Sequence, residues 1–371
     1  MLFFFFCIFN FALVRSRVFH ECGHEHLRGQ LHTHSMEELR MDEPIENLSS
    51  NDRKRQADQS IRIIFDTSFL GTGHQRECQT DGQIISLDDG TTVHQKTCTT
   101  DHILTNAKKT LIENEMNNIE SMFEILISTQ RLSRLRVSGA QPCGAYGGVD
   151  IPSQYTDNSQ RNTDLVIFVT AWPTLGARQL AWALACRFAS TYRPVMGQIN
   201  IDPSYLDTTN TNDLHLTLLH ELMHVLGFTS DLFPYYYDRS TGGQKAAGTV
   251  SRTVQRFGSK NTYEFVASNV LSTARTFFAC ASATGVELED FGERDNGQGG
   301  SHWESRTLQE ELMSPTLHDR SRFTEFTLSL LRDTGWYTVG DGVVADMFWG
   351  SQKGCAWLVD RCTTTSSWNG R

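Results

Sequence analysis

The chain has 371 residues and a formal net charge of −10 at pH 7, with 39% hydrophobic and 20% charged residues. This length can bury a large core and predicts two subdomains. The acidic balance argues against nucleic acid as the main partner, and the sequence shows no internal repeat or long low-complexity tract.

The N-terminus carries a hydrophobic run from Leu2 to Val14, followed by Arg15. The run is the right length for the core of a signal peptide and short for a membrane span, so we expect residues 1–16 to be a secretory signal. An uncleaved anchor is the alternative, because positively charged side chains before the run are missing. We expect no other segment to cross a bilayer, and the polar C-terminal end predicts no lipid-anchor signal.

Residues 17–60 are polar, have little periodicity and predict a pro-segment. The basic cluster at 53–55 is a natural processing site, with an ordinary solvated charge run as the alternative, and the one N-x-S/T sequon begins at Asn47. Within the segment, Cys22 stands among histidines in the stretch His20–His26. Its thiolate could close the open position of a zinc site, whereas the alternative is a solvated, metal-binding tract.

The globular part begins near residue 61 and predicts an α+β fold with a mixed sheet. Apolar periodicity predicts strands and helices over the following segments. The strands are Ile61–Phe65, Leu165–Thr170 and Met196–Ile201, and the helices are Leu104–Ser128 and Ala177–Ser190. We expect residues 61–230 to form an N-terminal catalytic subdomain.

The pattern H-E-x-x-H at His220–His224 lies in an apolar stretch that predicts a buried helix. Asn212 or Asp213 is expected to cap this helix, and Gly227 is expected to end it. Positions i and i+4 share one face of a helix, so both imidazoles can reach one metal ion with Glu221 beside them as a general base. The alternative is a buried helix whose histidines are ordinary core residues.

The second half predicts a subdomain over 231–371 that is mostly irregular or helical. Residues 229–262 are rich in Gly, Ser, Thr and Tyr and predict irregular structure, and a flexible loop is expected at Gly292–Gly300. Helices are expected at Tyr263–Phe278 and Phe326–Arg332.

The third metal ligand must come from this half. Short-spaced sites place a histidine three residues after the glycine, where this chain has Ser230. His302 precedes the sequence Met313-Ser314-Pro315, and a third histidine followed by a methionine turn suits a zinc site. His318 follows that turn and is expected at the surface. Carboxylate alternatives for the third ligand are Glu264 and Glu287.

The chain resembles the leishmanolysins, a family of metzincin zinc endopeptidases. The resemblance rests on segments that cover most of residues 60–365. They are Cys98–Lys109, His220–Phe228, Ser301–Trp303, Glu311–Pro315, Asp333–Tyr337 and Trp349–Cys355. It implies a metzincin fold, in which a mixed twisted sheet and the active-site helix precede a lower subdomain with the third ligand and the methionine turn.

The resemblance also implies roles for single residues. His220, His224 and His302 would bind one zinc ion, with Glu221 as the catalytic base and Met313 in the methionine turn. It favours Cys22 as a cysteine switch and Met196–Ile201 as the sheet edge that pairs with substrate. The implied disulfides are Cys78–Cys98, Cys143–Cys186 and Cys280–Cys355.

The expected function is a zinc-dependent endopeptidase, secreted or attached to the cell surface, made as a latent precursor and acting on proteins and peptides. One departure is Cys362, whose counterpart in the family pairs with a cysteine in a further C-terminal region, so it is expected to lack a partner within this chain. A non-catalytic adhesion protein on the same scaffold is the main alternative. A zinc hydrolase with a carboxylate third ligand is the second.

Overall fold

The structure is a computed structural model. It describes residues 18–22, 24, 36, 39–40, 57–88, 92–137, 141–157, 162–256, 260–290, 300–340, 344–360, 363–364 and 367–368. The expected signal peptide, the 53–55 cluster, Asn47, Cys362 and most of the glycine-rich loop lie outside these residues. Within the described part of the chain, no helix is long and apolar enough to cross a membrane.

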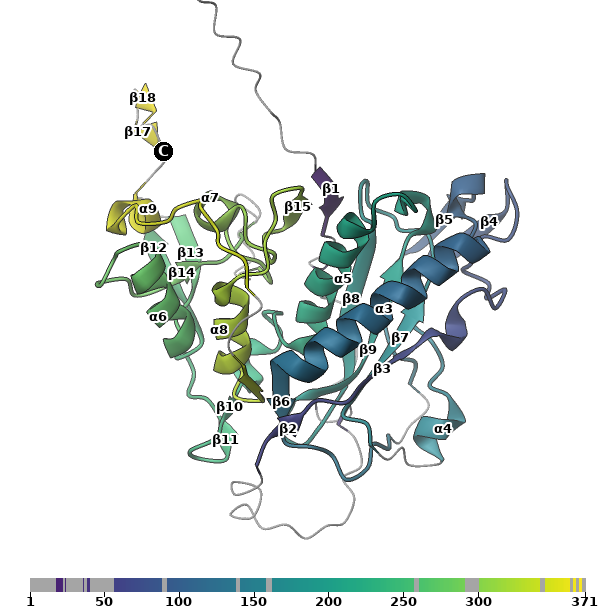
Figure 1. The fold of residues 1–371 in the computed structure, drawn as a ribbon, viewed down its shortest axis with the longest axis horizontal. Coiled ribbons are helices and arrows are strands. Elements are labelled where there is room, and N and C mark those ends of the chain that lie inside the picture. The colour runs from purple at the N-terminus through teal and green to yellow at the C-terminus, as the bar shows by residue number, and fades with distance from the viewer. Residues whose placement is uncertain are drawn as a thin grey trace, which may run out of the picture.

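A four-stranded mixed sheet is the centre of the first half (Figure 1). Its strands, in spatial order, are β3 (Ile63–Asp66), β7 (Leu165–Thr170), β9 (Pro194–Ile201) and β8 (Ala181–Phe188). β7 runs parallel to both β3 and β9, and β8 is antiparallel to β9. The prediction of a mixed sheet in an α+β fold is therefore confirmed.

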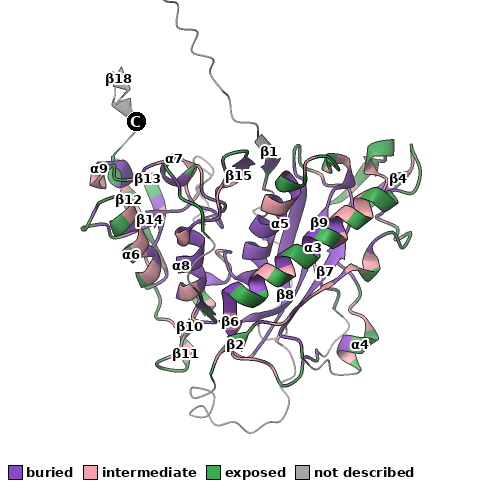
Figure 2. Ribbon diagram, in the orientation of Figure 1, coloured by how far each residue is buried: buried purple, intermediate pink, exposed green. Residues whose placement is uncertain are grey.

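Helices α3 (Asn106–Leu126) and α5 (Thr211–Leu226) pack beside this sheet. Figure 2 shows the contrast between them, because α3 alternates buried and exposed residues while α5 is buried along most of its length. A Cβ atom on Gly197 of β9 would lie 2.7 Å from Val225 Cγ1, so this glycine allows the close approach of α5 to the sheet. The N-cap of α5 is Asn210, so the predicted cap at Asn212 or Asp213 is wrong by two or three residues.

The helix predicted at Ala177–Ser190 is wrong, because this segment contains strand β8. Its residues alternate between small and large from Ala181 to Ala185. The alanines belong to the core that contains α5, whereas Trp182 and Leu184 belong to a second core on the other face of the sheet. A strand that is buried on both faces lacks the polar alternation by which half-buried strands are recognised.

The sheet edge was also predicted on the wrong strand. β9 lies inside the sheet between β7 and β8, so Met196–Ile201 cannot be the edge that receives substrate. β8 is one of the two outer strands, the other being β3, and a short turn at Ala189–Arg193 joins β8 to β9. The prediction failed because Ala177–Ser190 was expected to be a helix. This segment contains β8, the strand that covers that side of β9.

The second half contains more regular structure than expected. Residues 229–262 include strands, and the first residues of the predicted helix Tyr263–Phe278 belong to β13, so that helix begins only at Ser268. An antiparallel three-stranded sheet is formed by β12 (Ser251–Arg256), β13 (Lys260–Phe265) and β14 (Val286–Glu287). The helices here are α6 (Ser268–Phe277), α7 (Ser305–Leu308), α8 (Glu325–Asp333) and α9 (Cys355–Val359).

Short elements complete the fold. The strands are β1 (Val18–Glu21), β2 (Gln59–Ser60), β4 (Ile84–Asp88), β5 (Val93–Thr97), β6 (Ile127–Thr129), β10 (Tyr237–Asp238), β11 (Gly243–Gln244), β15 (Thr316–His318), β16 (Tyr337–Val339), β17 (Thr363–Thr364) and β18 (Ser367–Trp368), and one further helix is α4 (Ser153–Thr156). The structure contains the disulfides Cys78–Cys98, Cys143–Cys186 and Cys280–Cys355, the three pairs that the resemblance implied.

Candidate metal centre

Helix α5 brings His220, Glu221 and His224 into the interior, where all three are fully buried. The helix ends at Gly227, whose φ of 140° is in the region that favours glycine. The reversal of the chain there brings the Phe228 carbonyl back to the helix, where it accepts a hydrogen bond from His224 Nδ1 at 2.8 Å. The glycine therefore both ends the helix and orients a histidine ring.

His302 enters the same site from a segment far along the chain. Its ring centroid lies 5.2 Å from that of His220 and 4.9 Å from that of His224, and the residue is fully buried. The Trp303 N–H donates to the Met313 carbonyl at 2.9 Å. The segment that carries the third histidine is thus fixed directly to the methionine turn.

The turn around Met313 also orients His220, whose Nδ1 donates to the Leu312 carbonyl at 2.7 Å. Within the turn, the carboxylate of Glu311 accepts from Met313 N at 2.6 Å and from the hydroxyls of Thr324 and Thr327. Sequence reasoning missed Glu311. The only feature of the sequence that pointed to its role in the turn was the position of an acidic residue directly before the apolar pair Leu312-Met313.

The hydrogen bonds of His220 and His224 decide where their protons lie. A carbonyl oxygen only accepts, so both Nδ1 atoms must carry hydrogen. Burial lowers the pKa of His220 to about 4 and that of His224 well below its usual value, so both rings are neutral and each Nε2 has a bare lone pair. These two Nε2 atoms are 3.1 Å apart. Two lone pairs at this distance repel each other unless a cation lies between them.

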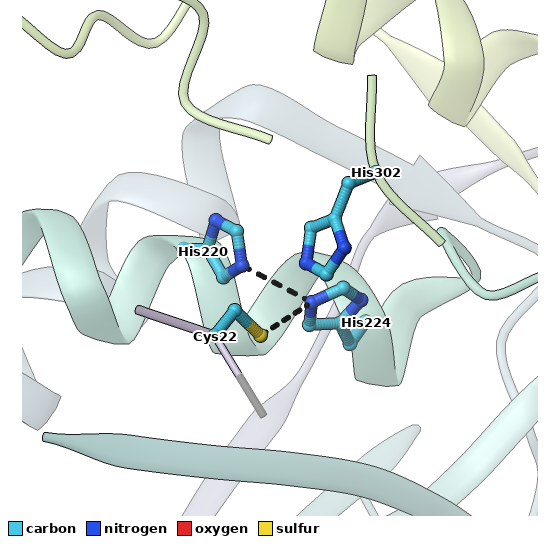
Figure 3. Close-up of side chains that lie close together, drawn as sticks. All are labelled: Cys22, His220, His224 and His302. Carbon is cyan, nitrogen blue, oxygen red and sulfur yellow. Dashed lines mark hydrogen bonds between the residues drawn. The ribbon is translucent and has the colours of Figure 1, made fainter. Parts of the chain in front are cut away.

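The donor set fits zinc. One ligand atom each from Cys22, His220, His224 and His302 lie within 4.8 Å of one another (Figure 3). Burial also lowers the pKa of His302 well below its usual value, and a neutral imidazole is the form that binds metal. Zinc prefers four nitrogen and sulfur ligands in such a cluster.

Cys22 reaches the cluster from the N-terminal strand β1. Its Sγ is 3.4 Å from His224 Nε2 and 3.7 Å from Glu221 Oε1. β1 pairs antiparallel with β15, and Cys22 N donates to the Pro315 carbonyl at 2.9 Å. The strand therefore lies beside β15 and α5 (Figure 1). Figure 3 shows the Cys22 side chain directed toward the histidines.

The flanking histidines of the N-terminal segment are also engaged. His20 Nδ1 accepts from Leu180 N at 3.2 Å, which leaves the proton on Nε2, 3.1 Å from Glu221 Oε1. The ring of His24 stacks on that of His224 with centroids 4.0 Å apart, and His24 Nδ1 lies 2.9 Å from the Ala183 carbonyl. The spacing of His20 and His24, each two residues from Cys22, was visible in the sequence. Which residues the two histidines contact could not be predicted from it.

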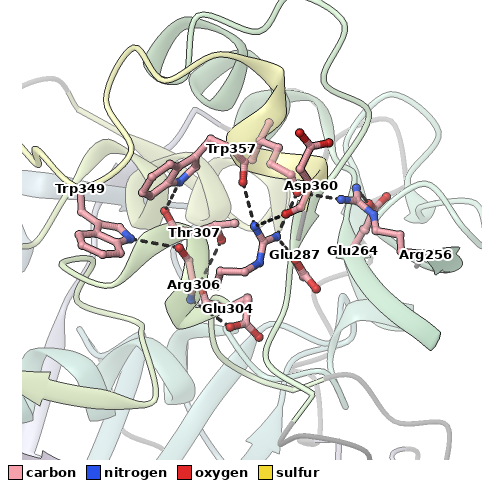
Figure 4. A network of polar contacts seen from close by, with 10 residues as sticks. Arg256, Glu264, Glu287, Glu304, Arg306, Thr307, Trp349, Trp357 and Asp360 are labelled. Carbon is pink, nitrogen blue, oxygen red and sulfur yellow. Dashed lines mark hydrogen bonds and ion pairs between the residues drawn. The ribbon is translucent and has the colours of Figure 1, made fainter. Parts of the chain in front are cut away.

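The other candidate ligands lie elsewhere. His318 is 5% exposed, so its predicted surface position is wrong, and its Nε2 lies 3.1 Å from the Gln309 carbonyl. Glu264 pairs with Arg252 and Arg256, and Glu287 pairs with Arg306, in a polar network that fastens the end of α9 (Figure 4). The carboxylates considered for a third ligand are thus committed to arginines and are not members of the cluster.

Comparison with known proteins agrees with this arrangement. The leishmanolysin family model matches residues 26–369. The chain belongs to the leishmanolysin family. It is 31% identical to a leishmanolysin homolog of Crithidia fasciculata over 313 residues, which is 81% of this chain and 44% of the relative.

Two other relatives show the same range of similarity. The leishmanolysin of Leishmania donovani is 28% identical over 82% of this chain and 48% of its own length. A leishmanolysin-like peptidase of Caenorhabditis elegans is 30% identical over 54% of this chain and 35% of its own length. The chain thus spans less than half the length of these curated relatives.

Proposed function

We propose that this chain is a zinc-dependent endopeptidase that hydrolyses internal peptide bonds of proteins, is secreted or attached to the cell surface, and is made as a latent precursor. The observation that carries the proposal is the buried cluster in which three neutral imidazoles converge beside Glu221. Membership of the leishmanolysin family supports it.

In this proposal His220, His224 and His302 hold one zinc ion through their imidazoles. The bound ion would act as a Lewis acid that polarises the scissile carbonyl and lowers the pKa of water in the open position to about 7. The Leu312 and Phe228 carbonyls fix two of the rings by binding their Nδ1–H groups. Such outer partners orient the ligands and make them more basic. Met313 belongs to the turn that supplies one of these carbonyls.

Glu221 is the general base. It is fully buried, and burial raises the pKa of its carboxyl above the usual value. Once the N-terminal segment has left, this carboxylate accepts a proton from the attacking water and returns it to the nitrogen of the departing amine. Glu221 then acts as both base and acid, and its carboxylate is deprotonated again when the reaction is complete.

Latency follows from the position of the N-terminal segment. Cys22 would supply a thiolate as the fourth ligand, while the ring of His20 lies against the carboxylate of Glu221. A strand bound in this way excludes water and substrate together. Removal of the segment is then the activating step.

The position of cleavage can be narrowed from the contacts of Asp58. Its carboxylate binds Arg239 at 2.7 Å as well as the Thr338 hydroxyl, and the following strand β2 pairs with β6. These residues are part of the folded domain, so cleavage is expected before Asp58, at the 53–55 cluster. We propose a signal peptide at residues 1–16 and a pro-segment that runs from residue 17 to the 53–55 cluster, slightly shorter than the expected 17–60.

The alternative, a non-catalytic adhesion protein, predicts loss of the base or of a ligand, and this chain retains all four residues. The deciding experiment measures hydrolysis of a protein such as casein after the pro-segment is removed, with and without a zinc chelator. Chelator-sensitive hydrolysis is expected for the wild type and none for Glu221→Gln. Chelator-insensitive hydrolysis, or equal rates for both proteins, would overturn the proposal.

A further inference from the structure

The N-terminal segment has a second anchor at the far end of β8. Phe188 N donates to the Leu39 carbonyl at 3.1 Å, and Arg40 forms a parallel β-bridge with Phe188. Leu39 is 5% exposed and belongs to the main hydrophobic core. The guanidinium carbon of Arg40 lies 5.4 Å from the ring centroid of Tyr192. A backbone bond, a buried aliphatic side chain and a cation–π contact therefore coincide at this place.

This anchor and the metal centre share one strand. His24 meets the carbonyl of Ala183, and Phe188 follows Ala183 by five residues in β8. Five residues of extended strand span about 17 Å. β8 thus binds the N-terminal segment at the metal centre and again about 17 Å further along.

The receiving surface belongs to the folded domain. The turn from β8 to β9 is closed by hydrogen bonds from Ala189 N to the Arg193 carbonyl at 2.8 Å and from Tyr192 N to the Ala189 carbonyl at 2.9 Å. Trp336 Nε1 fixes the turn from outside by donating to the Thr191 carbonyl at 2.8 Å. A cavity of about 320 Å³ adjoins the anchor and is lined by Arg40, Ser190, Thr191, Tyr237 and residues 242–244.

We propose that this surface at Phe188 and Tyr192, here called the 188–192 subsite, binds an extended segment of protein substrates in which an aliphatic residue is followed by a basic one. The proposal rests on the proposed function, since the N-terminal segment must leave before a substrate can enter. In the precursor, Leu39 and Arg40 occupy the subsite as a built-in mimic of that ligand.

Each contact selects one feature of the ligand. The Phe188 N–H requires an acceptor on an extended backbone, as in peptide recognition by strand addition. The buried position of Leu39 favours an aliphatic side chain, since a polar one would lose its hydration there. The face of Tyr192 attracts a cation and repels an acid. The pair must lie at least about five residues from the scissile bond.

The test uses the full-length chain with the mimic removed, L39S/R40S, and a fluorescein-labelled peptide with the sequence of residues 33–43, THSMEELRMDE. A control peptide has serine in place of its leucine and arginine. Anisotropy should show the probe binding to L39S/R40S at least ten-fold more tightly than the control peptide, because one buried leucine accounts for such a factor. The wild-type chain should bind the probe weakly, because its own segment fills the subsite.

A matched pair of additional substitutions locates the binding. Tyr192 has a φ of 62°, so asparagine suits this backbone better than alanine. Added to L39S/R40S, Tyr192→Asn should weaken probe binding about two- to five-fold, and Tyr192→Phe, which keeps the ring, should not. Where L39S/R40S does not fold, Leu39→Ala alone, which removes the buried anchor with a smaller change, should give the same ranking of the two peptides.

Equal binding of both peptides, or probe binding to the wild type as tight as to L39S/R40S, would overturn the subsite. Both results come from a binding assay. Absence of peptidase activity would overturn the proposed function but would not change the result of the binding assay. Failure of the subsite and failure of the proposed function can therefore be told apart.

Discussion

His20 Nε2 lies 3.1 Å from Glu221 Oε1, so the N-terminal segment contacts the base as well as the metal-binding histidines. Burial lowers the pKa of His20 to about 3, so this ring is neutral where it faces the carboxylate of Glu221. Two residues later, Cys22 Sγ lies 3.4 Å from His224 Nε2. The short stretch from His20 to Cys22 thus contacts both halves of the proposed catalytic machinery.

Replacing Glu221 with glutamine should abolish hydrolysis without removing the metal. An amide cannot accept the proton of the attacking water, so the rate should fall by about a hundred- to ten-thousand-fold. Zinc content should stay near one per chain, because Glu221 is not a ligand. Enzyme kinetics and elemental analysis on one preparation check both statements, and hydrolysis within ten-fold of the wild type would refute the role of Glu221.

His302→Ala should release zinc, because it removes one of three imidazoles. The matched control is His318→Ala, another buried histidine of the second half whose ring lies against the Gln309 carbonyl outside the cluster. Zinc titration with a competing chelator should show a much weaker site in His302→Ala and wild-type affinity in His318→Ala. Equal zinc affinity in the two variants would mean that another residue is the third ligand.

Cys22→Ser should give a precursor that is active before cleavage. A serine hydroxyl is a far weaker zinc ligand than a thiolate, so water and substrate gain access to the open position. Hydrolysis by the uncleaved variant should exceed that of the uncleaved wild type at least ten-fold, and the double variant C22S/E221Q should stay inactive. If the uncleaved Cys22→Ser chain is as inactive as the wild type, the thiol is not what holds the precursor latent.

The pKa of Glu311 is raised to about 7 by burial, against its ordinary value of 4.5, with its hydrogen bonds acting in the opposite direction. The folded state therefore binds more protons than the unfolded state between about pH 4.5 and 7, and the contribution of Glu311 to stability declines as pH rises through that window. Glutamine imitates the protonated acid. The free energy of unfolding of Glu311→Gln should match the wild type near pH 4 and exceed it by up to about 3 kcal/mol at pH 8.

Urea denaturation of both proteins at several pH values measures this difference. Only the difference between the two profiles counts, because other titrating groups affect both proteins alike. Parallel profiles from pH 4 to 8 would show that Glu311 does not titrate in this range.

The sequence predicted the parts of the site that depend on local spacing. The four-residue interval from His220 to His224 places both on one face of a helix, and Gly227 marks the end of that helix. The interval of two residues from His20 to Cys22 and from Cys22 to His24 was equally visible. Its meaning was not, because it depends on partners about two hundred residues away.

The errors have a physical pattern. β8 is covered on both faces, so its apolar residues lack the alternation with polar ones that identifies a strand. His318 looked like a surface residue because burial depends on β15 packing against β1, a contact between distant segments. Glu311 could not be identified because its partners Thr324 and Thr327 approach only in the folded chain. Each failure concerns a long-range contact.

The central claim is that the latent precursor holds one zinc ion with three imidazoles and the thiolate of Cys22. Zinc X-ray absorption spectroscopy on the uncleaved full-length protein tests it most directly. We predict a nitrogen shell at about 2.0–2.1 Å and one sulfur at about 2.3 Å, with the sulfur lost in Cys22→Ser. A zinc spectrum without sulfur in the wild-type precursor, or a sulfur shell that survives in Cys22→Ser, would contradict the account.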